Sequence, residues 1–333
     1  MQPTGDLHRW SSVRRMHTLR TADDRFVDLP GWPYAPQYVD VADPDGGSAL
    51  RMHYVDEGPT DGPVVLLLHG EPTWAYLYRK MIPGLVEAGC RVIAPDHIGF
   101  GRSDKPAAKA DYTFRRHVDW VSEFVTALEL RDITYFGQDW GSLIGLTVVA
   151  RLPERFRGIV LANGVLPNPT DPDFGAAALS SPDPEAFGRW QAVAREANGF
   201  DLGRLLREGL AGIGGVSIDL TDAEAAAYDA PFPDTSYQAG VLEFPALAGP
   251  NGAEGEPFTM WVEAWSVLST WTKPLVCRFG KADPVLGWYD DYMIAKVPGA
   301  AGQPHATFPE GRHFIQEQEP DSLVEAILHV VRS

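Results

Sequence analysis

Residues 133–141 read ITYFGQDWG, a short apolar run followed at once by an aspartate between two glycines. The run Ile133–Phe136 predicts a buried strand, and a helical pattern begins near Gly141. This order of strand, sharp turn and helix is typical of a nucleophile elbow, which presents one side chain outward. The glycines leave room for the turn. We therefore expect Asp139 to be a nucleophile, although an aspartate at this place could simply cap the helix.

On both sides of this unit, short apolar runs alternate with segments of helical period. The other runs that predict strands are Val64–Leu68, Val92–Ala94, Gly158–Ala162 and Leu275–Phe279. Helical patterns cover Ala75–Ala88, Phe114–Leu128, Gly141–Arg151, Met260–Ser269 and Asp321–Val331. Ahead of them, Tyr38–Val41 and Leu50–Val55 predict an antiparallel hairpin. The alternation indicates an α/β fold, with a mostly parallel central sheet flanked by helices.

The alternation stops between residues 166 and 245. Helical pieces there are expected near Pro184–Ala197, Leu202–Leu210 and Asp222–Tyr228. A connection of this length is too long for a simple loop, so we predict an inserted helical cap at the sheet edge that binds ligands. The predicted division is 1–36 for an N-terminal extension and lead-in, 37–165 for the first part of the core, 166–245 for the cap and 246–333 for the second part of the core.

The composition narrows the classes of function. The chain has 333 residues, 44% of them hydrophobic, and a net charge of −17, which argues against nucleic acid or anionic lipid as a partner. It lacks an apolar run that could span a bilayer and a signal-peptide pattern, so we expect a soluble, cytoplasmic protein. The residues before Met16 resemble an unstructured extension, and Met16 is an alternative start. Cys90 and Cys277 are expected to be reduced core thiols, and no Cys/His spacing suits zinc.

An aspartate at the elbow, in place of the more usual serine, changes the chemistry. An ionised carboxylate can attack without first losing a proton, and the product is an ester. Because a carboxylate is a modest nucleophile, displacement at a saturated carbon that bears a leaving group suits it best. Neither a metal nor a cofactor is needed for this reaction.

A base and an orienting acid follow late in the chain. His313 lies in a loop after the apolar segment Ala306–Phe308 and before the last helix, where a base could activate water against the ester. Asp283 follows the strand Leu275–Phe279 and precedes His313 by thirty residues, so the chain order is nucleophile, acid, base. An aspartate before a proline is also a common turn residue. The other place for the acid, after Gly158–Ala162, is occupied by Asn163.

The loop His69–Pro72 follows the most apolar strand and predicts an oxyanion hole. The backbone N–H groups of Glu71 and Trp140 would be its two donors, stabilising the negative charge that develops on an oxygen of Asp139 when water attacks the ester. A tight turn at the end of a strand is the alternative interpretation.

Several motifs together resemble the haloalkane dehalogenases of the α/β-hydrolase superfamily. They are His69–Trp74 (HGEPTW), Asp96–Pro106 (DHIGFGRSDKP), Gln138–Gly141 (QDWG) and, in the cap, Tyr228–Gly240 (YDAPFPDTSYQAG). Glu71 and the late acid Asp283 are similar to the first subfamily. The likeness runs from about Leu19 to the C-terminus and is weakest between Pro167 and Gly215.

The resemblance implies hydrolysis of small haloalkanes to an alcohol, a halide and a proton through a covalent alkyl-aspartate ester. It implies that the indole N–H groups of Trp140 and Trp190 bind the halide. Indole suits this role because it donates a hydrogen bond and accepts none. The implied lining of a small apolar pocket is Phe187, Phe232, Pro233, Leu143, Val285 and Leu286. Leu143 and Val285 are smaller than the family pattern predicts, which suggests a wider cavity. The expected partners are a haloalkane, water and halide, and we expect a monomer while leaving an oligomer open.

Three other interpretations compete with this one. An epoxide hydrolase shares the fold and the aspartate nucleophile, and Tyr228 and Tyr237 could protonate its substrate. A fluoroacetate dehalogenase would need an arginine near the nucleophile, which Trp140-Gly141 lacks. A non-catalytic ligand-binding protein on the same fold predicts that a member of the triad is missing.

Overall fold

The computed structural model describes residues 16–209, 213–248 and 256–333. The predicted extension before Met16 lies outside the described residues. Within them, no helix is both long enough and apolar enough to cross a membrane.

An 8-stranded sheet forms the centre of the molecule, in the order β10-β9-β8-β7-β4-β5-β3-β2. Its strands are β2 (Gln37–Val41), β3 (Leu50–Glu57), β4 (Val64–Leu68), β5 (Arg91–Pro95), β7 (Ile133–Gly137), β8 (Phe156–Leu161), β9 (Leu275–Gly280) and β10 (Ala306–Phe308). The strands from β10 to β5 are parallel, while β3 is antiparallel to both β5 and β2. Two short strands, β1 (Thr18–Leu19) and β6 (Lys105–Pro106), pair separately. The predicted strands, hairpin and α/β class are confirmed.

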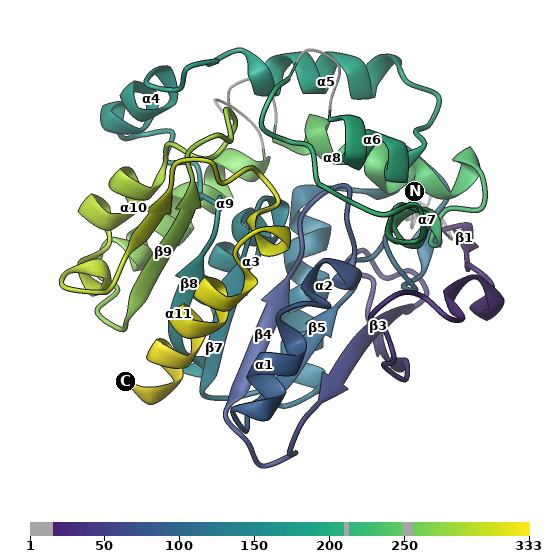
Figure 1. Cartoon of the computed structure of the whole chain (residues 1–333), viewed down its shortest axis with the longest axis horizontal. Coiled ribbons are helices and arrows are strands. Elements are labelled where there is room, and N and C mark those ends of the chain that lie inside the picture. The colour runs from purple at the N-terminus through teal and green to yellow at the C-terminus, as the bar shows by residue number, and fades with distance from the viewer. Residues whose placement is uncertain (1–15, 210–212, 249–255) are drawn as a thin grey trace, which may run out of the picture.

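Helices cover both faces of the sheet (Figure 1). The core helices are α1 (Ile82–Glu87), α2 (Phe114–Ala127), α3 (Trp140–Arg151), α9 (Glu256–Leu268), α10 (Asp290–Lys296) and α11 (Pro320–Arg332). Short 3-10 helices cover Asp23–Phe26, Ala75–Tyr78, Lys109–Asp111, Pro153–Arg155, Thr235–Gln238, Pro298–Ala300 and Ile315–Glu317. Helices α1 and α11 lie on one face, and α2, α3 and α9 pack together on the other.

Strand β4 shows how the sheet joins two apolar cores. Leu66 and Leu68 belong to the cluster under α2, α3 and α9, whereas Val65 and Leu67 belong to the cluster under α1 and α11. All four side chains are fully buried. Because successive side chains point to opposite faces, a strand covered on both sides is apolar throughout. Burial of each such side chain stabilises the fold by about 1.5–3 kcal/mol. The strand therefore ends where the apolar run gives way to a polar loop.

The helical segment predicted near Ala75–Ala88 is divided into two helices in the structure. The structure has a 3-10 helix at Ala75–Tyr78 and then α1, which begins at Ile82 with Pro83 in its first turn. Proline lacks the backbone N–H that an interior helical position must donate, so Pro83 favours a new helix start at this point.

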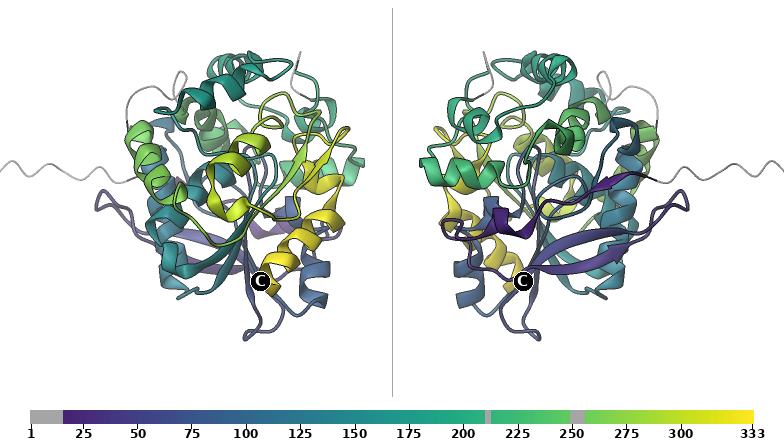
Figure 2. Two further views of the ribbon diagram at one scale, coloured as in Figure 1. Left: turned by 90° about the vertical axis from the view of Figure 1, so that its left-hand side faces the viewer. Right: turned by 90° about the vertical axis from the view of Figure 1, so that its right-hand side faces the viewer.

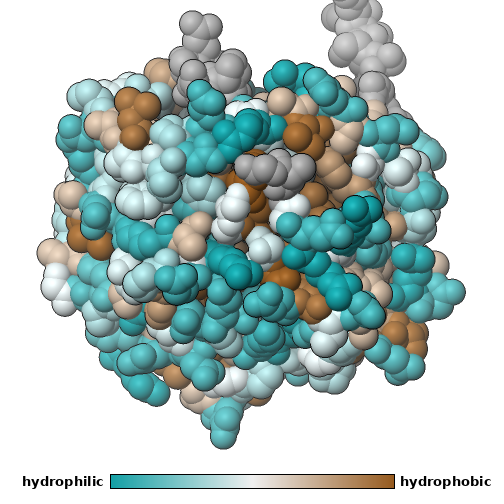
Figure 3. Space-filling model, turned by 45° about the horizontal axis from the view of Figure 1, so that its top comes forward, coloured by the Kyte–Doolittle hydropathy of each residue, from teal (hydrophilic) through white to brown (hydrophobic). Residues whose placement is uncertain are grey.

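The cap helices lie over the C-terminal ends of the strands, as the side views also show (Figure 2). They are α4 (Pro172–Leu179), α5 (Ala186–Glu196), α6 (Leu202–Glu208), α7 (Asp222–Asp229) and α8 (Ala239–Leu247). Helices α5, α6 and α7 agree with predicted pieces, except that Leu210 lies outside the described residues; α4 and α8 were not predicted. The surface on this side is largely hydrophilic, with hydrophobic side chains in small groups (Figure 3). The predicted residue boundaries of the domains stay a prediction, and α8 runs past the expected end of the cap at 245.

Candidate active site

Asp139 occupies the sharp turn between β7 and α3. Its backbone has φ 50° and ψ −129°, a conformation that costs free energy for any residue with a side chain. Hydrogen bonds hold the turn: the Asp139 N–H donates to Asn163 O at 3.0 Å, and the Ser142 N–H and Oγ both donate to Asp139 O, at 2.8 and 2.6 Å. The elbow therefore projects the Asp139 carboxylate above the end of the sheet.

Two glycines allow the neighbouring segments to approach this carboxylate. A Cβ on Gly70 would lie 2.4 Å from Cβ and Oδ1 of Asp139, and one on Gly141 would lie 1.9 Å from Leu68 O. Both distances are far shorter than real contacts. The close approach of the loop after β4 to the start of α3 thus requires glycine at both positions.

The Asp139 carboxylate has different partners at its two oxygens. Oδ1 accepts a hydrogen bond from the backbone N–H of Glu71 at 2.8 Å. The backbone N–H of Trp140 also stabilises the charged form of the carboxylate. Oδ2 lies 3.6 Å from Nε2 of His313. Burial raises the pKa of Asp139 above its ordinary value, and His313 and the two N–H groups oppose that rise.

His313 lies between the two aspartates. Its Nδ1 is 2.8 Å from Oδ2 of Asp283, which is fully buried. Burial lowers the pKa of His313, but the charge and hydrogen bond of Asp283, together with Asp139, outweigh burial and hold that pKa above its ordinary value. Burial raises the pKa of Asp283, but His313 and the other hydrogen-bond donors outweigh burial and hold that pKa below its ordinary value. The pair is arranged as an acid that orients and polarises an imidazole.

Two amide side chains that the sequence analysis left without a role complete this arrangement. Asn163 donates to Asp283 Oδ2 at 2.8 Å and to Gly280 O at 3.0 Å, so the residue at the alternative acid position supports the acid. Nε2 of Gln138 lies 3.2 Å from Nε2 of His313 and donates to His313 O at 3.1 Å. An N–H donated to Nε2 favours the tautomer in which Nδ1 carries the proton toward Asp283 and Nε2 keeps its lone pair, as a base requires.

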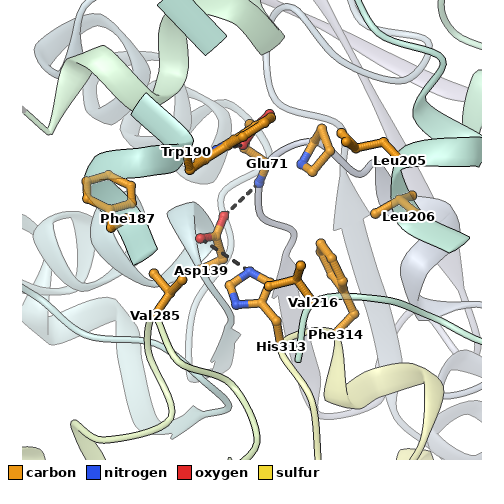
Figure 4. A pocket seen from close by; sticks show the side chains of 11 residues that line it. Glu71, Asp139, Phe187, Trp190, Leu205, Leu206, Val216, Val285, His313 and Phe314 are labelled. Atoms are coloured by element: carbon orange, nitrogen blue, oxygen red, sulfur yellow. Dashed lines mark hydrogen bonds and ion pairs between the residues drawn. The ribbon is translucent and has the colours of Figure 1, made fainter. Parts of the chain in front are cut away.

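These groups open into a cavity of about 40 Å³ between core and cap (Figure 4). Its lining consists of Glu71, Pro72, Asp139, Phe187, Trp190, Leu205, Leu206, Val216, Val285, His313 and Phe314. Most of this lining is apolar, and all of its charged or titratable side chains come from the loops after β4, β7 and β10. Within the described ranges, no group of three or more His, Cys, Asp or Glu side chains is placed to hold a metal ion.

Comparisons with known proteins agree on one family. A family model for the alpha/beta hydrolase fold matches residues 63–241. A haloalkane dehalogenase of Mycolicibacterium paratuberculosis is 47% identical over 313 residues, covering 94% of this chain and 98% of that protein. One of Psychrobacter cryohalolentis is 44% identical over 316 residues, covering 95% and 98%. The chain belongs to the haloalkane dehalogenase family.

The solved structures point to the same family. Haloalkane dehalogenase DpaA of Paraglaciecola agarilytica, whose structure is described as tetrameric, is 34% identical, with a TM-score of 0.78 and coverage of 96% of this chain and 99% of that one. The fold, with its mostly parallel sheet and flanking helices, is the fold of these haloalkane dehalogenases.

The structure brings some of the residues expected of a haloalkane dehalogenase into the cavity and leaves others outside it. Glu71, Asp139, Phe187, Trp190, Val285 and His313 line it, and Asp283 lies behind His313. The expected lining residues Leu143, Phe232, Pro233 and Leu286 do not line it, and Pro233 is exposed. Of the two small residues that suggested a wider cavity, only Val285 therefore bears on its width.

A Phe-Pro pair that was not among the expected lining residues lies beside Trp140. Phe244 in α8 packs edge-on against Trp140, with ring centroids 5.0 Å apart, and Pro245 follows it. Phe232 instead lies near Lys105, whose Nζ is 5.9 Å from the ring centroid. The indole of Trp140 is buried against Phe244 and Phe114 and is not part of the cavity lining.

The second expected halide ligand already has a partner. The Trp190 N–H from α5 donates to Oε2 of Glu71 at 3.2 Å, so this bond joins the cap to the loop after β4. Burial and the nearby charge of Asp139 raise the pKa of Glu71 well above its ordinary value, and the indole N–H opposes this only in part. The cavity thus contains two carboxyl groups in different environments.

Proposed function

We propose that the protein hydrolyses small haloalkanes to an alcohol, a halide and a proton, with Asp139 as the nucleophile. The arrangement that carries the proposal is the line from Asp283 through His313 to Asp139, at 2.8 Å and 3.6 Å, beside a cavity that is mostly apolar. An apolar cavity suits an uncharged alkyl group, and the carboxylate lies at its charged end.

In the first step Oδ2 of Asp139 attacks the carbon that bears the halogen. The carbon–halogen bond breaks as the carbon–oxygen bond forms, and the halide leaves with the electron pair of the broken bond. The indole N–H groups of Trp190 and Trp140 are proposed to receive the halide. Donors without a lone pair in a dry site stabilise the ion and cannot attack the substrate.

In the second step Nε2 of His313 takes a proton from water, and the water oxygen attacks the carbonyl carbon of the ester. Negative charge develops on Oδ1, which already accepts a hydrogen bond from the backbone N–H of Glu71. The backbone N–H of Trp140 stabilises this charge as well. Loss of one such donor has reduced rates by about 10²–10³-fold in other enzymes. Collapse of the intermediate releases the alcohol, and the proton on His313 passes to solvent.

Replacement of the base tests the proposal. His313→Gln should form the ester and fail to hydrolyse it, so exposure to 1-bromobutane should increase the protein mass by one butyl group, located at Asp139. His313→Gln/Asp139→Ala is the matched control and should gain no mass. An unchanged mass in His313→Gln itself would overturn the assignment.

The epoxide hydrolase alternative finds no support from its two tyrosines. Tyr228 is fully buried and its hydroxyl donates to Glu317 at 2.6 Å, while Tyr237 is only half-buried; neither lines the cavity. Parallel incubation with 1-bromobutane and styrene oxide separates the two activities, since the first releases bromide and the second a diol.

The remaining alternatives are also less well supported. Across the described residues, no arginine lines the cavity, as an enzyme for fluoroacetate would need. A ligand-binding protein without catalysis predicts a lost triad member, whereas Asp139, Asp283 and His313 are all present and adjacent. The monomeric state stays a prediction.

A further inference from the structure

The Glu71 side chain is the least explained group in the cavity. Its carboxyl is buried, with 5% of the residue exposed, and it lies in the cavity lining next to Trp190 (Figure 4). Oε2 accepts from the Trp190 N–H at 3.2 Å, whereas Oε1 finds no hydrogen-bond partner among the residues that the structure describes. The proposed mechanism uses only the backbone N–H of this residue.

Two buried carboxyl groups in one small cavity cannot both be ionised cheaply. Asp139 has the better environment for a charge, because it has two backbone N–H donors and His313, whereas Glu71 has a single indole. The titratable side chains that line the cavity with Glu71 are Asp139, from the turn after β7, and His313, from the loop after β10; the described part of the cap contributes none. The proton of the pair therefore belongs on Glu71.

We infer that Glu71, held as a neutral carboxylic acid, is a third hydrogen-bond donor for the departing halide, beside Trp190. The inference rests on the proposed function and adds a halide-binding residue to it. A protonated carboxyl group has one O–H to donate, and Oε1, without a partner, is the oxygen that can carry it. The proton stays on Glu71 throughout, so the step requires no proton transfer.

This arrangement explains why the acid must be neutral. An ionised Glu71 would place a negative charge next to the leaving anion, in a medium where such repulsion is strong. A neutral Glu71 gives the halide a donor, and its Oε2 can release the indole N–H of Trp190 to the same ion. Halide affinity should therefore depend on the protonation of Glu71: it should be full while the proton is bound and fall as the pH rises through the pKa of Glu71.

Bromide binding, measured by isothermal titration calorimetry, tests this without turnover. All variants carry His313→Gln, so that titration of the imidazole cannot cause a pH effect. With Glu71 intact, affinity should fall about tenfold or more when its proton is lost, the equivalent of one hydrogen bond to a charged group. With Glu71→Gln, which keeps a neutral donor, affinity should not change with pH. With Glu71→Leu it should be about tenfold weaker at every pH.

Three results would overturn the inference. They are an alkaline loss of bromide affinity in Glu71→Gln that equals the loss with Glu71 intact, unweakened binding by Glu71→Leu, and bromide binding that does not change with pH while Glu71 is intact. The Gln variant is nearly isosteric, so it remains informative if the Leu variant does not fold. The mass increase of the same His313→Gln protein with 1-bromobutane is read separately. A mass increase with pH-independent bromide binding refutes only the role of Glu71, whereas no mass increase refutes the proposed function.

Discussion

The contact between His313 and Asp283 sets the pH at which the base can act. Their 2.8 Å contact holds the pKa of His313 above its ordinary value, so the imidazole stays protonated to a higher pH than a free one. Only the neutral imidazole can take a proton from water. Hydrolysis of the ester should therefore increase with pH, with a midpoint above the ordinary histidine value of about 6.5.

Asp283→Asn should move this midpoint to lower pH, because the negative charge that favours the imidazolium is lost. It should also slow hydrolysis at the plateau, since the wrong tautomer of the imidazole has cost about 10⁴-fold in a Ser-His-Asp triad. Single-turnover decay of the ester as a function of pH measures both effects. Asp291→Asn, at an exposed position of α10, is the control and should leave the midpoint unchanged. A midpoint that stays in place in Asp283→Asn would contradict the account.

The sequence predicts the backbone-determined parts of the site better than its side-chain contacts. Asp139 and His313 lie where strands end, and the order of strands along the chain brings strand ends together. The sequence marked residue 163 only as a place where an acid could stand and an asparagine stands instead. The hydrogen bond from Asn163 to Asp283 could not be predicted, because it joins residues 120 apart in sequence. The cap contains two Phe-Pro pairs, and nothing local shows that Phe244, and not Phe232, reaches Trp140.

At the scale of elements, a buried ionic network ties the cap to the core. Arg79, which follows the 3-10 helix after β4, contacts Glu317 at 2.5 Å and Glu224 of α7 at 2.8 Å. Glu317 also accepts from the hydroxyl of Tyr228 in α7. Glu317 belongs to the 3-10 helix that begins at Ile315, two residues after His313. Its carboxylate therefore connects the cap, the region after β4 and the segment that carries the base.

Glu317→Gln should destabilise the fold by about 3 kcal/mol, the lower end of the range for a broken buried ion pair, because Glu224 still faces Arg79. Chemical denaturation measures the loss. The matched control is Glu208→Gln, which breaks the exposed pair between Arg204 and Glu208 on the cap surface and should leave the free energy of unfolding unchanged. Equal stability of Glu317→Gln and the parent protein would show that the network contributes no net stability.

Elements with a regular pattern were predictable, and those shaped by proline or small residues were not. Helix α2 has polar and apolar sides and a threonine cap, Thr113, that accepts from Arg116 N. Helix α8 contains Pro245 in its interior, and α4 is a short helix, rich in small residues, in which no residue is fully buried. Such helices depend on packing against the rest of the molecule and not on local preference, so sequence alone gives them little signal.

At the scale of the whole molecule, three buried histidines couple stability to acid. His69, His97 and His117 are each at most 1% exposed, and burial lowers the pKa of all three, that of His117 to about 3. When the chain unfolds, each imidazole regains a pKa of about 6.5. Between these values the unfolded chain binds protons that the folded chain excludes, so acid favours unfolding. Glu71 and Asp139, whose pKa values are raised, act in the opposite direction.

A comparison of variants isolates one of these opposing contributions. In the described part of the chain, neither ring nitrogen of His117 has a hydrogen-bond partner, and the ring is stacked on Tyr112. His117→Leu removes this titration and leaves the others in place. Relative to the parent protein, the variant should gain about 1.4 kcal/mol per pH unit below about pH 6.5, hence about 2 kcal/mol by about pH 5. Urea denaturation at a series of pH values, at constant ionic strength, gives this difference directly. His329→Gln, at an exposed position, is the control and should show no such trend. If the difference between His117→Leu and the parent protein stays constant with pH, the buried imidazole is already protonated in the folded protein.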